Sequence, residues 1–437
     1  MSARSGGFRR DGCRPDGGRE AGSRLRLALL CPEPVEGATG GIGTYSATLA
    51  RGLADLGHRV HLVAPRGDMP AGIEAKGDLS LHRLELGPPA RLPFGNRFWG
   101  LSLACWPWIR EAAKAVRRIH AAHSLDLVEV PEWMAGALHL PRQLPIVIRH
   151  HTHAALVRRL NDRPESLDQR LRAALEGLAM RRGTMRLANS RALAEAASLD
   201  HRLPLSEIGV LRLGVDVERF RPGMPASLRD ELGIPREHVV MAFVGRLERR
   251  KGIDVLAQAF ARLAPRVPYL HLLLAGGDTQ TLDGSAWDAV MRTAQEAGVL
   301  DRVHWLGSLA SERLPEVYAA SDALVAPSRM EPFGMVYLEA MASGLPVIGT
   351  LAGGVPEIVG SERHGYLVLP GSVDSLQVAM MALATDETRR RRMGREARRH
   401  VEVMFDQRRI ARLTVEAYLE AIRRRTGKEA GYGALAP

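Results

Sequence analysis

The sequence predicts an α/β protein of two domains, each a doubly wound parallel sheet, that face each other across a central cleft. Short apolar segments alternate with longer amphipathic segments along almost the whole chain, which is the pattern of repeated strand-helix units. This pattern restarts near residue 239 after a polar stretch that contains prolines, and 437 residues are too many for one ordinary core. Because doubly wound sheets bind ligands at the carboxyl ends of their strands, the cleft is the expected binding site.

The first half opens with an apolar strand, a glycine-rich loop and a helix that extends to about Gly57. The strands predicted in this half are residues 25–30, 59–64, 79–86, 125–130, 146–150, 185–188 and 208–213. Period-2 alternation at the end of the strand 146–150 predicts that Arg149, His151 and His153 share one face, with His150 on the other.

The second half repeats the arrangement and ends in a helix. Its predicted strands are residues 239–244, 269–275, 303–306, 323–326, 346–348 and 366–369. Helical spacing of apolar residues predicts a helix over 406–425. The predicted organisation is a disordered leader 1–24, a first domain 25–213, a linker 214–236, a second domain 237–403, a terminal helix within 404–425 and a tail 426–437.

The charge of the chain is strongly positive, with a formal net charge of +11 and a pI near 10.1. Arginines concentrate in the leader and in residues 158–186. The low aromatic content, 5%, and the lack of a recognisable nucleic-acid module argue against nucleic-acid binding. The 158–186 cluster is either a solvated helix face or a contact surface for an anionic membrane or an acceptor.

Several features bear on the compartment. No apolar run approaches the roughly 20 residues that span a bilayer, and the leader lacks the apolar core of a secretory signal. The three cysteines are odd in number and widely separated, which favours a reducing compartment. We expect a cytoplasmic protein, either free or peripheral at the inner face of the membrane. Three tryptophans are expected to line the core or the cleft: Trp99, Trp106 and Trp108.

Two carboxylates flank a glycine in the segment Glu331-Pro-Phe-Gly-Met-Val-Tyr-Leu-Glu339. Gly334 is expected to initiate a helix, so that Glu331 precedes the helix and Glu339 lies inside it. A helix N-terminus offers free N–H groups and partial positive charge to a phosphate, and carboxylates accept hydrogen bonds from vicinal hydroxyls. The segment therefore suits a nucleotide sugar, although paired carboxylates also serve as acid and base in sugar hydrolysis.

In each half, one further loop of interest follows the first strand. Gly40-Gly-Ile-Gly-Thr-Tyr45 opens the first helix, and glycines there let a ligand approach backbone N–H groups; the alternative is a plain tight turn. In the second half, Arg246 and Lys251 lie five positions apart across a turn into a helix, so both can reach a diphosphate. Arg249 and Arg250 of the same turn are expected to be solvated.

Three other polar positions have competing interpretations. The histidines of the segment 149–153 could bind substrate, serve the structure or ligate a metal, and no partner at ligand spacing supports the metal. Ser190 is best explained as the N-cap of the following helix. Glu357 follows a double glycine, where it either stabilises the first turn of a helix or belongs to the site.

Taken in order, these elements resemble the retaining, nucleotide-sugar-dependent glycosyltransferases of family 4, the group 1 type, which have the GT-B fold of two Rossmann-like domains. The resemblance covers residues 25 to about 424. The segments that carry it are residues 40–45, 128–133, 149–152, 188–190, 214–222, 245–252 and 331–339.

The resemblance implies roles for the residues of the 331–339 segment. Glu331 would contact hydroxyls of the donor sugar, and Glu339 would bind the ribose hydroxyls. Backbone N–H groups of Phe333, Gly334 and Met335 would hold the donor phosphate.

It also implies roles for the other two loops and the histidine segment. Arg246 and Lys251 would neutralise the diphosphate, Gly41 would close over it together with Gly43 of the same loop, and His151 would lie beside the reacting sugar. The residues expected to be catalytic are Glu331, His151, Arg246 and Lys251.

The implied activity is transfer of a sugar from a nucleotide-sugar donor to a hydroxyl of a glycan or lipid-linked acceptor, in glycan, glycolipid or cell-envelope polysaccharide synthesis. The resemblance also implies that no metal or other cofactor is required. Alternatives on the same architecture are a phosphorylase, a nucleotide-sugar epimerase and a catalytically silent nucleotide-sugar-binding protein. Two features depart from the family, namely His153 and the long acidic loop 32–39, and both lie on the acceptor side.

Overall fold

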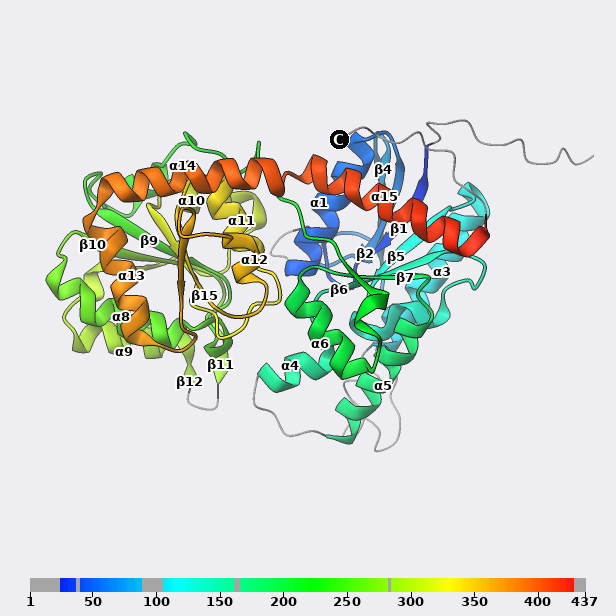
Figure 1. Cartoon of the computed structure of the whole chain (residues 1–437), viewed down its shortest axis with the longest axis horizontal. Helices are drawn as coiled ribbons and strands as arrows, with labels where there is room; N and C mark the ends of the chain where they lie inside the picture. The colour runs from blue at the N-terminus through cyan, green and yellow to red at the C-terminus, as the bar shows by residue number, and fades with distance from the viewer. Residues whose placement is uncertain (1–23, 37–39, 89–104, 161–165, 282–283, 428–437) are drawn as a thin grey trace, which may run out of the picture.

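The computed structural model describes residues 24–36, 40–88, 105–160, 166–281 and 284–427, which form two lobes with one large sheet each (Figure 1). The sheet of the first lobe has the order β3(Gly72–Lys76), β4(Leu79–Leu84), β2(Arg59–Pro65), β1(Arg26–Leu30), β5(Leu127–Pro131), β6(Ile146–His150), β7(Met185–Ala188), β8(Ile208–Val210). The sheet of the second lobe has the order β13(Val303–Trp305), β10(Leu270–Ala275), β9(Val239–Val244), β14(Ala323–Val325), β15(Val347–Thr350), β16(Gly365–Val368). The predicted fold class is confirmed.

One edge strand departs from the predicted parallel sheet. β3 pairs antiparallel with β4, whereas the other strand pairs of this sheet are parallel. All five residues of β3 are exposed, and its apolar alternation is limited to Ile73 and Ala75, which is too short a pattern to predict a strand. An antiparallel edge strand of this kind is common on otherwise parallel sheets.

Helices cover both sheets, as the buried apolar strands require. Those of the first lobe are α1(Gly41–Asp55), α3(Trp106–His123), α4(Ala154–Leu160), α5(Leu167–Arg181) and α6(Arg191–His201). Those that follow are α7(Ser227–Glu231), α8(Ile253–Leu263), α9(Ala286–Glu296), α10(Leu314–Ala319), α11(Met335–Ala342), α12(Val355–Val359), α13(Val373–Thr385), α14(Glu387–Met404) and α15(Gln407–Thr426). A hairpin of β11(Gln280–Thr281) and β12(Gly284–Ser285) precedes α9.

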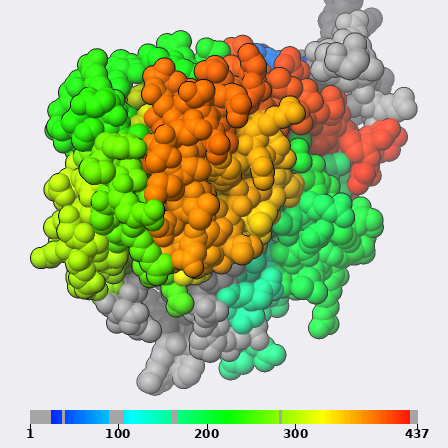
Figure 2. Space-filling view, turned by 60° about the vertical axis from the view of Figure 1, so that its left-hand side comes forward, coloured from blue at the N-terminus to red at the C-terminus, as the bar shows by residue number. Residues whose placement is uncertain are grey.

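The last helix of the chain crosses back to the first lobe (Figure 1). α14 lies on the second lobe and α15 packs along α1, where the hydroxyl of Tyr418 donates to Glu129 at 2.9 Å. In Figure 2 the orange segment that ends in α14 continues into the red α15. The C-terminal helix therefore closes the core of a lobe that is formed mainly by the first half of the chain.

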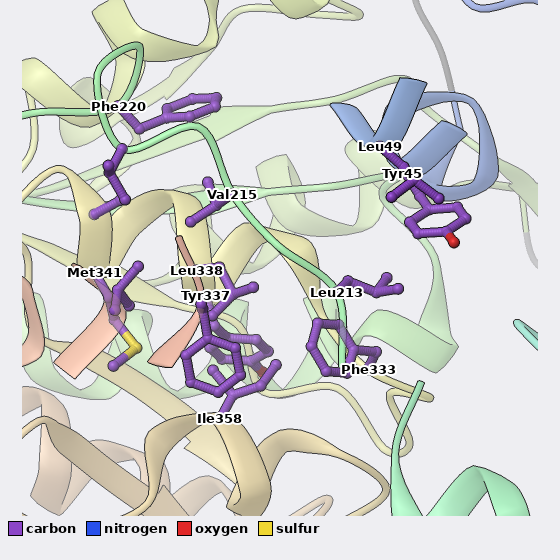
Figure 3. Close-up of a cluster of buried hydrophobic side chains, with 14 of the residues drawn as sticks. Tyr45, Leu49, Leu213, Val215, Phe220, Phe333, Tyr337, Leu338, Met341 and Ile358 are labelled. Atoms are coloured by element: carbon purple, nitrogen blue, oxygen red, sulfur yellow. The ribbon is translucent and has the colours of Figure 1, made fainter. Parts of the chain in front are cut away.

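A single hydrophobic cluster connects the two lobes. Figure 3 shows it running from Tyr45 on α1, past Leu213 of the connecting segment and Phe333, to Tyr337 of α11, with Phe220 on the far side. Phe333 is 3% exposed and Tyr337 is fully buried. The segment around Glu331 is thus anchored by apolar packing on its C-terminal side.

Some predictions concern residues outside the described ones. These are nearly all of the leader 1–24, most of the tail and Trp99. Of the other two tryptophans, Trp108 is buried, as expected, whereas Trp106 is 45% exposed. Among the described helices, none has the length and apolar character needed to cross a membrane.

Candidate active site

The central feature of the candidate site is an ion pair between two segments that are 80 positions apart in the sequence. The Nζ of Lys251, at the end of the 3₁₀ turn before α8, lies 2.5 Å from Oε2 of Glu331, and Ser328 Oγ lies 3.4 Å from the same oxygen. Burial opposes ionisation of Glu331, but the charges of Lys251 and Arg250 outweigh it and lower the pKa of this carboxyl. Glu331 is therefore an anion and not a proton donor.

The glycine between the two carboxylates performs the predicted structural role. Gly334 has φ +108° and is the N-cap residue of α11, and no side chain caps this helix. A Cβ at Gly334 would come within 2.6 Å of the Tyr337 ring, so a side chain is sterically excluded as well as conformationally strained. The backbone N–H groups at the start of α11 therefore stay available for an anion beside Glu331.

Glu339 lies deeper than the rest of the motif. It is 3% exposed, and its Oε2 accepts a hydrogen bond from Tyr318 at 2.7 Å. Burial raises the pKa of Glu339, and the hydrogen bond and the more distant Arg219 oppose that rise. The proposed role toward ribose hydroxyls stays a prediction.

The basic turn places its arginines in different surroundings. Arg246 is 68% exposed at the side chain, and its nearest carboxylate is Glu248 at 3.5 Å. Arg249 is exposed, as expected. The expectation that Arg250 is solvated was wrong, because its side chain is only 15% exposed and Nη2 donates to Glu248 at 2.6 Å. Arg250 adds positive charge near Glu331 that sequence reasoning missed, since nothing local distinguishes it from Arg249.

The glycine loop of the first lobe carries a carboxylate at its helix start. Oε2 of Glu33 accepts a hydrogen bond from the N–H of Gly43 at 3.0 Å, and a Cβ at Gly40 would meet the same carboxylate at 2.5 Å. A Cβ at Gly41 would meet nothing within 4 Å. The acidic character of the loop 32–39 was the only signal in the sequence for this contact.

His151 is held at the end of β6 by three partners. Its backbone N–H donates to both carboxylate oxygens of Glu132, at 2.8 and 2.9 Å, its Nδ1 lies 3.1 Å from Asn189 Nδ2, and its ring centroid is 4.9 Å from that of Tyr45. Burial and, next, the charge of Arg149 lower the pKa of His151 to about 3. The imidazole is therefore neutral at physiological pH and can hydrogen-bond but carries no charge.

The predicted placement of His153 was wrong. β6 ends at His150, so strand alternation does not extend to residue 153. His153 is instead fully buried away from Tyr45, with Nε2 2.5 Å from Asp200 and its ring 4.7 Å from that of His201. Across the described residues, no group of three His, Cys, Asp or Glu side chains is arranged to hold a metal ion.

Ser190 links the two lobes. Its Oγ accepts from the N–H of Leu193 at 3.1 Å, which confirms the predicted N-cap of α6. The same hydroxyl donates to the carbonyl oxygen of Pro332 at 2.6 Å, next to Glu331. Because Ser190 follows β7 and Pro332 follows β14, the carboxyl ends of strands from both sheets meet here.

The arginine cluster 158–186 is only partly a solvated face. Arg182 donates to the carbonyl oxygens of Leu138 and Leu140, and Arg172 lies over the Trp133 ring at 4.1 Å. These side chains therefore connect α5 and its C-terminal end to the rest of the first lobe. Arg170 and Arg181 are exposed on α5.

Comparison with known proteins identifies the family. The model described as "Glycosyltransferase Family 4" matches residues 39–219, and the model described as "Glycosyl transferases group 1" matches residues 226–400. A D-inositol 3-phosphate glycosyltransferase from Nocardia farcinica is 31% identical over 417 residues, 92% of this chain and 89% of the relative. The chain belongs to the group 1 glycosyltransferases of family 4. A second relative, a D-inositol 3-phosphate glycosyltransferase from Mycolicibacterium smegmatis, is 32% identical to this glycosyltransferase. The match covers 77% of this chain and 76% of the relative.

Solved structures show the same fold. Sucrose-phosphate synthase from Thermosynechococcus elongatus superposes with a TM-score of 0.73 at 26% identity, covering 91% of this chain and 99% of that one. HepE from Anabaena, solved in complex with UDP-glucose, gives a TM-score of 0.66 at 20% identity, covering 90% and 99%. The two lobes of this glycosyltransferase therefore form a GT-B fold.

Proposed function

We propose that this glycosyltransferase moves a sugar from a nucleotide-diphosphate sugar to an acceptor hydroxyl with retention at the anomeric carbon. The observation that carries the proposal is the Lys251–Glu331 pair, which brings a fixed cation and a fixed anion to the uncapped start of α11. The helix start and Lys251 suit the two phosphates of the donor, with exposed Arg246 free to turn toward them, and Glu331 suits the hydroxyls of its sugar.

The charge states favour a direct reaction over acid–base catalysis by the protein. Glu331 is ionised and His151 is neutral, so neither offers an acidic proton to a leaving group. In the proposed step the acceptor oxygen bonds to the anomeric carbon as the bond to the diphosphate breaks. The acceptor proton passes to an oxygen of the departing diphosphate, and the protein contributes positioning and electrostatic stabilisation. We propose that no metal or other cofactor is required, because Lys251 and Arg246 supply positive charge.

The acceptor side is proposed from the relatives and the first lobe. The relatives are named for D-inositol 3-phosphate, so a phosphorylated polyol is one acceptor to test beside glycan and lipid-linked hydroxyls. A role in glycan, glycolipid or cell-envelope polysaccharide synthesis fits either class. Membership of the family favours a transferase over the phosphorylase, the epimerase and the silent binding protein that share the architecture.

A panel of nucleotide sugars tests the donor. We expect one of the UDP, GDP, ADP and dTDP sugars to raise the melting temperature in the presence of a chelator, because a ligand at 100 times its Kd adds about 2.7 kcal/mol to the free energy of unfolding. The matching sugar should then be transferred to an acceptor from a panel that includes D-inositol 3-phosphate. Absence of a thermal shift with every donor would contradict the nucleotide-sugar assignment.

We also propose that the first lobe contacts an anionic membrane through α5. Three leucines at helical spacing are exposed on this helix, Leu167 by 66%, Leu171 by 39% and Leu178 by 54%. Exposed Arg170 and Arg181 flank this stripe, and an apolar stripe beside arginines is typical of helices that lie on anionic lipid.

Liposome flotation tests this contact. Replacing Leu171 and Leu178 with serine should abolish flotation with vesicles that contain phosphatidylglycerol, because both the apolar area and its alignment are lost. The control is Val378→Ser on α13, which removes an apolar side chain that is 71% exposed on the other lobe. Equal flotation of the leucine variant and the control would contradict the proposal.

A further inference from the structure

Two covalent connections join the lobes, and they lie next to each other. The segment that leaves the first lobe and the segment that returns to it run side by side. The N–H of Val215 donates to the carbonyl oxygen of Phe405 at 2.9 Å, and the N–H of Gln407 donates to the carbonyl oxygen of Val215 at 3.0 Å. Two adjacent crossings of this kind form a natural hinge. Contacts between the lobes away from this crossing therefore decide how far the cleft opens.

Such a contact exists at the N-terminus of α6. The first three N–H groups of an α-helix need external acceptors, and here two of them point to the opposite lobe. Oε1 of Glu357 accepts a hydrogen bond from the backbone N–H of Arg191 at 2.8 Å and lies 3.4 Å from the backbone nitrogen of Ala192. Nη2 of Arg212 lies 3.8 Å from Oε2 of Glu357. Ser190 satisfies the third N–H itself and donates its own proton to Pro332.

The carboxylate of Glu357 suits this position for two reasons. A helix N-terminus carries partial positive charge and stabilises an anion, and a hydrogen bond to a charged acceptor is stronger than one between neutral groups. The Glu357 side chain is 20% exposed, so solvent screens the contact only in part. The carboxylate serves the helix of the other lobe, although Glu357 itself lies in the first turn of α12.

The same contact is connected to Glu331. The N–H of Gly354, three positions before Glu357, donates to the carbonyl oxygen of Glu331 at 2.9 Å. A Cβ at Gly354 would lie 2.6 Å from the Pro332 carbonyl oxygen and 2.9 Å from Cβ of Ser190, so the three segments are in close packing. Movement of α6 away from Glu357 would therefore also withdraw Ser190 from Pro332, the residue next to Glu331.

We propose that Glu357 and Ser190 form a latch that holds the cleft closed and positions the Glu331 segment for the donor. Neither is a catalytic residue; they act by tying the start of α6 in one lobe to the 331–333 and 353–357 segments of the other. Loss of the latch should populate an open arrangement in which Lys251 and Glu331 stay within their own lobe but the first lobe no longer faces them.

Small-angle X-ray scattering on the full chain without ligand tests the latch separately from the proposed function. Glu357→Gln should increase the radius of gyration and raise the KM for the nucleotide-sugar donor about tenfold, with a smaller change in kcat, because part of the binding energy then closes the cleft. The matched control is Glu195→Gln, which removes a carboxylate that pairs with Arg191 Nε at 3.0 Å within α6 and, among the described residues, forms no ion pair with the other lobe. The Glu195→Gln variant should leave the radius of gyration and the KM for the donor unchanged.

A second pair of variants distinguishes loss of the latch from loss of helix stability alone. Ser190→Ala removes a helix cap and the bond to Pro332, whereas Ser166→Ala removes the corresponding cap of α5, where Ser166 exchanges hydrogen bonds with Gln169 of its own helix. Both should lower the melting temperature, and only Ser190→Ala should increase the radius of gyration. An unchanged radius of gyration in both Glu357→Gln and Ser190→Ala would overturn the latch, whatever the donor proves to be.

Discussion

Replacing Lys251 with alanine is expected to lower the rate of sugar transfer about 10²- to 10³-fold while the fold is retained. The Nζ of Lys251 lies 2.5 Å from Glu331 and beside the proposed diphosphate position, so the variant loses a fixed positive charge where negative charge develops on the leaving group. The loss also leaves Glu331 buried without its closest cation. Its pKa should therefore rise, which favours a protonated carboxyl that binds sugar hydroxyls less well.

The measurement is kcat and KM with the donor found in the panel, together with circular dichroism to follow the fold. Arg249→Ala is the control, because Arg249 is an exposed cation on the same turn. A Lys251→Ala enzyme with near-normal transfer would count against the assignment of the site, as would an equal loss in the Arg249 variant.

Replacing Gly353 with alanine is expected to reduce transfer at least about 10²-fold, although position 353 bears no chemically active group. Gly353 has φ +62°, and a Cβ there would lie 2.0 Å from the carbonyl oxygen of Glu331. Backbone atoms cannot yield that much locally, so the Glu331 segment must move by an ångström or more. A displacement of that size at a reacting centre costs about two orders of magnitude in rate.

Gly371→Ala separates this displacement from the general strain of a left-handed backbone. Gly371 has φ +77°, and a Cβ there would meet nothing within 4 Å. Both variants should lose a similar amount of stability from the strained backbone, of the order of 1–2 kcal/mol, with a further loss in Gly353→Ala. If transfer rates of the two variants prove equal, the close contact between positions 353 and 331 has no role in the site.

Much of the fold could be predicted from the sequence because it depends on local periodicity. The buried strands are continuous apolar runs, and the restart of the pattern at Val239 marks the first strand of the second sheet. β3 was not predicted in this way, because its apolar alternation is limited to Ile73 and Ala75 and its place in the sheet comes from its pairing with β4.

The same distinction between local pattern and long-range packing applies to the candidate site. The sequence by itself determined the start of α11 at Gly334, the cap at Ser190 and the residue types that suit a phosphate and a sugar, because each depends on neighbours within a few positions. The error at His153 has the converse cause: strand alternation holds only while the strand lasts, and β6 ends at His150.

Only the tertiary structure decided which of these groups meet. It paired Lys251 with Glu331, partly covered Arg250, placed the Glu33 carboxylate on the glycine loop and set Glu357 on the start of α6. These contacts join residues that lie up to 166 positions apart, as for Arg191 and Glu357. The physical reason is that burial and the packing of two sheets fix such distances, whereas a sequence pattern reports only which face of its own helix or strand a residue occupies.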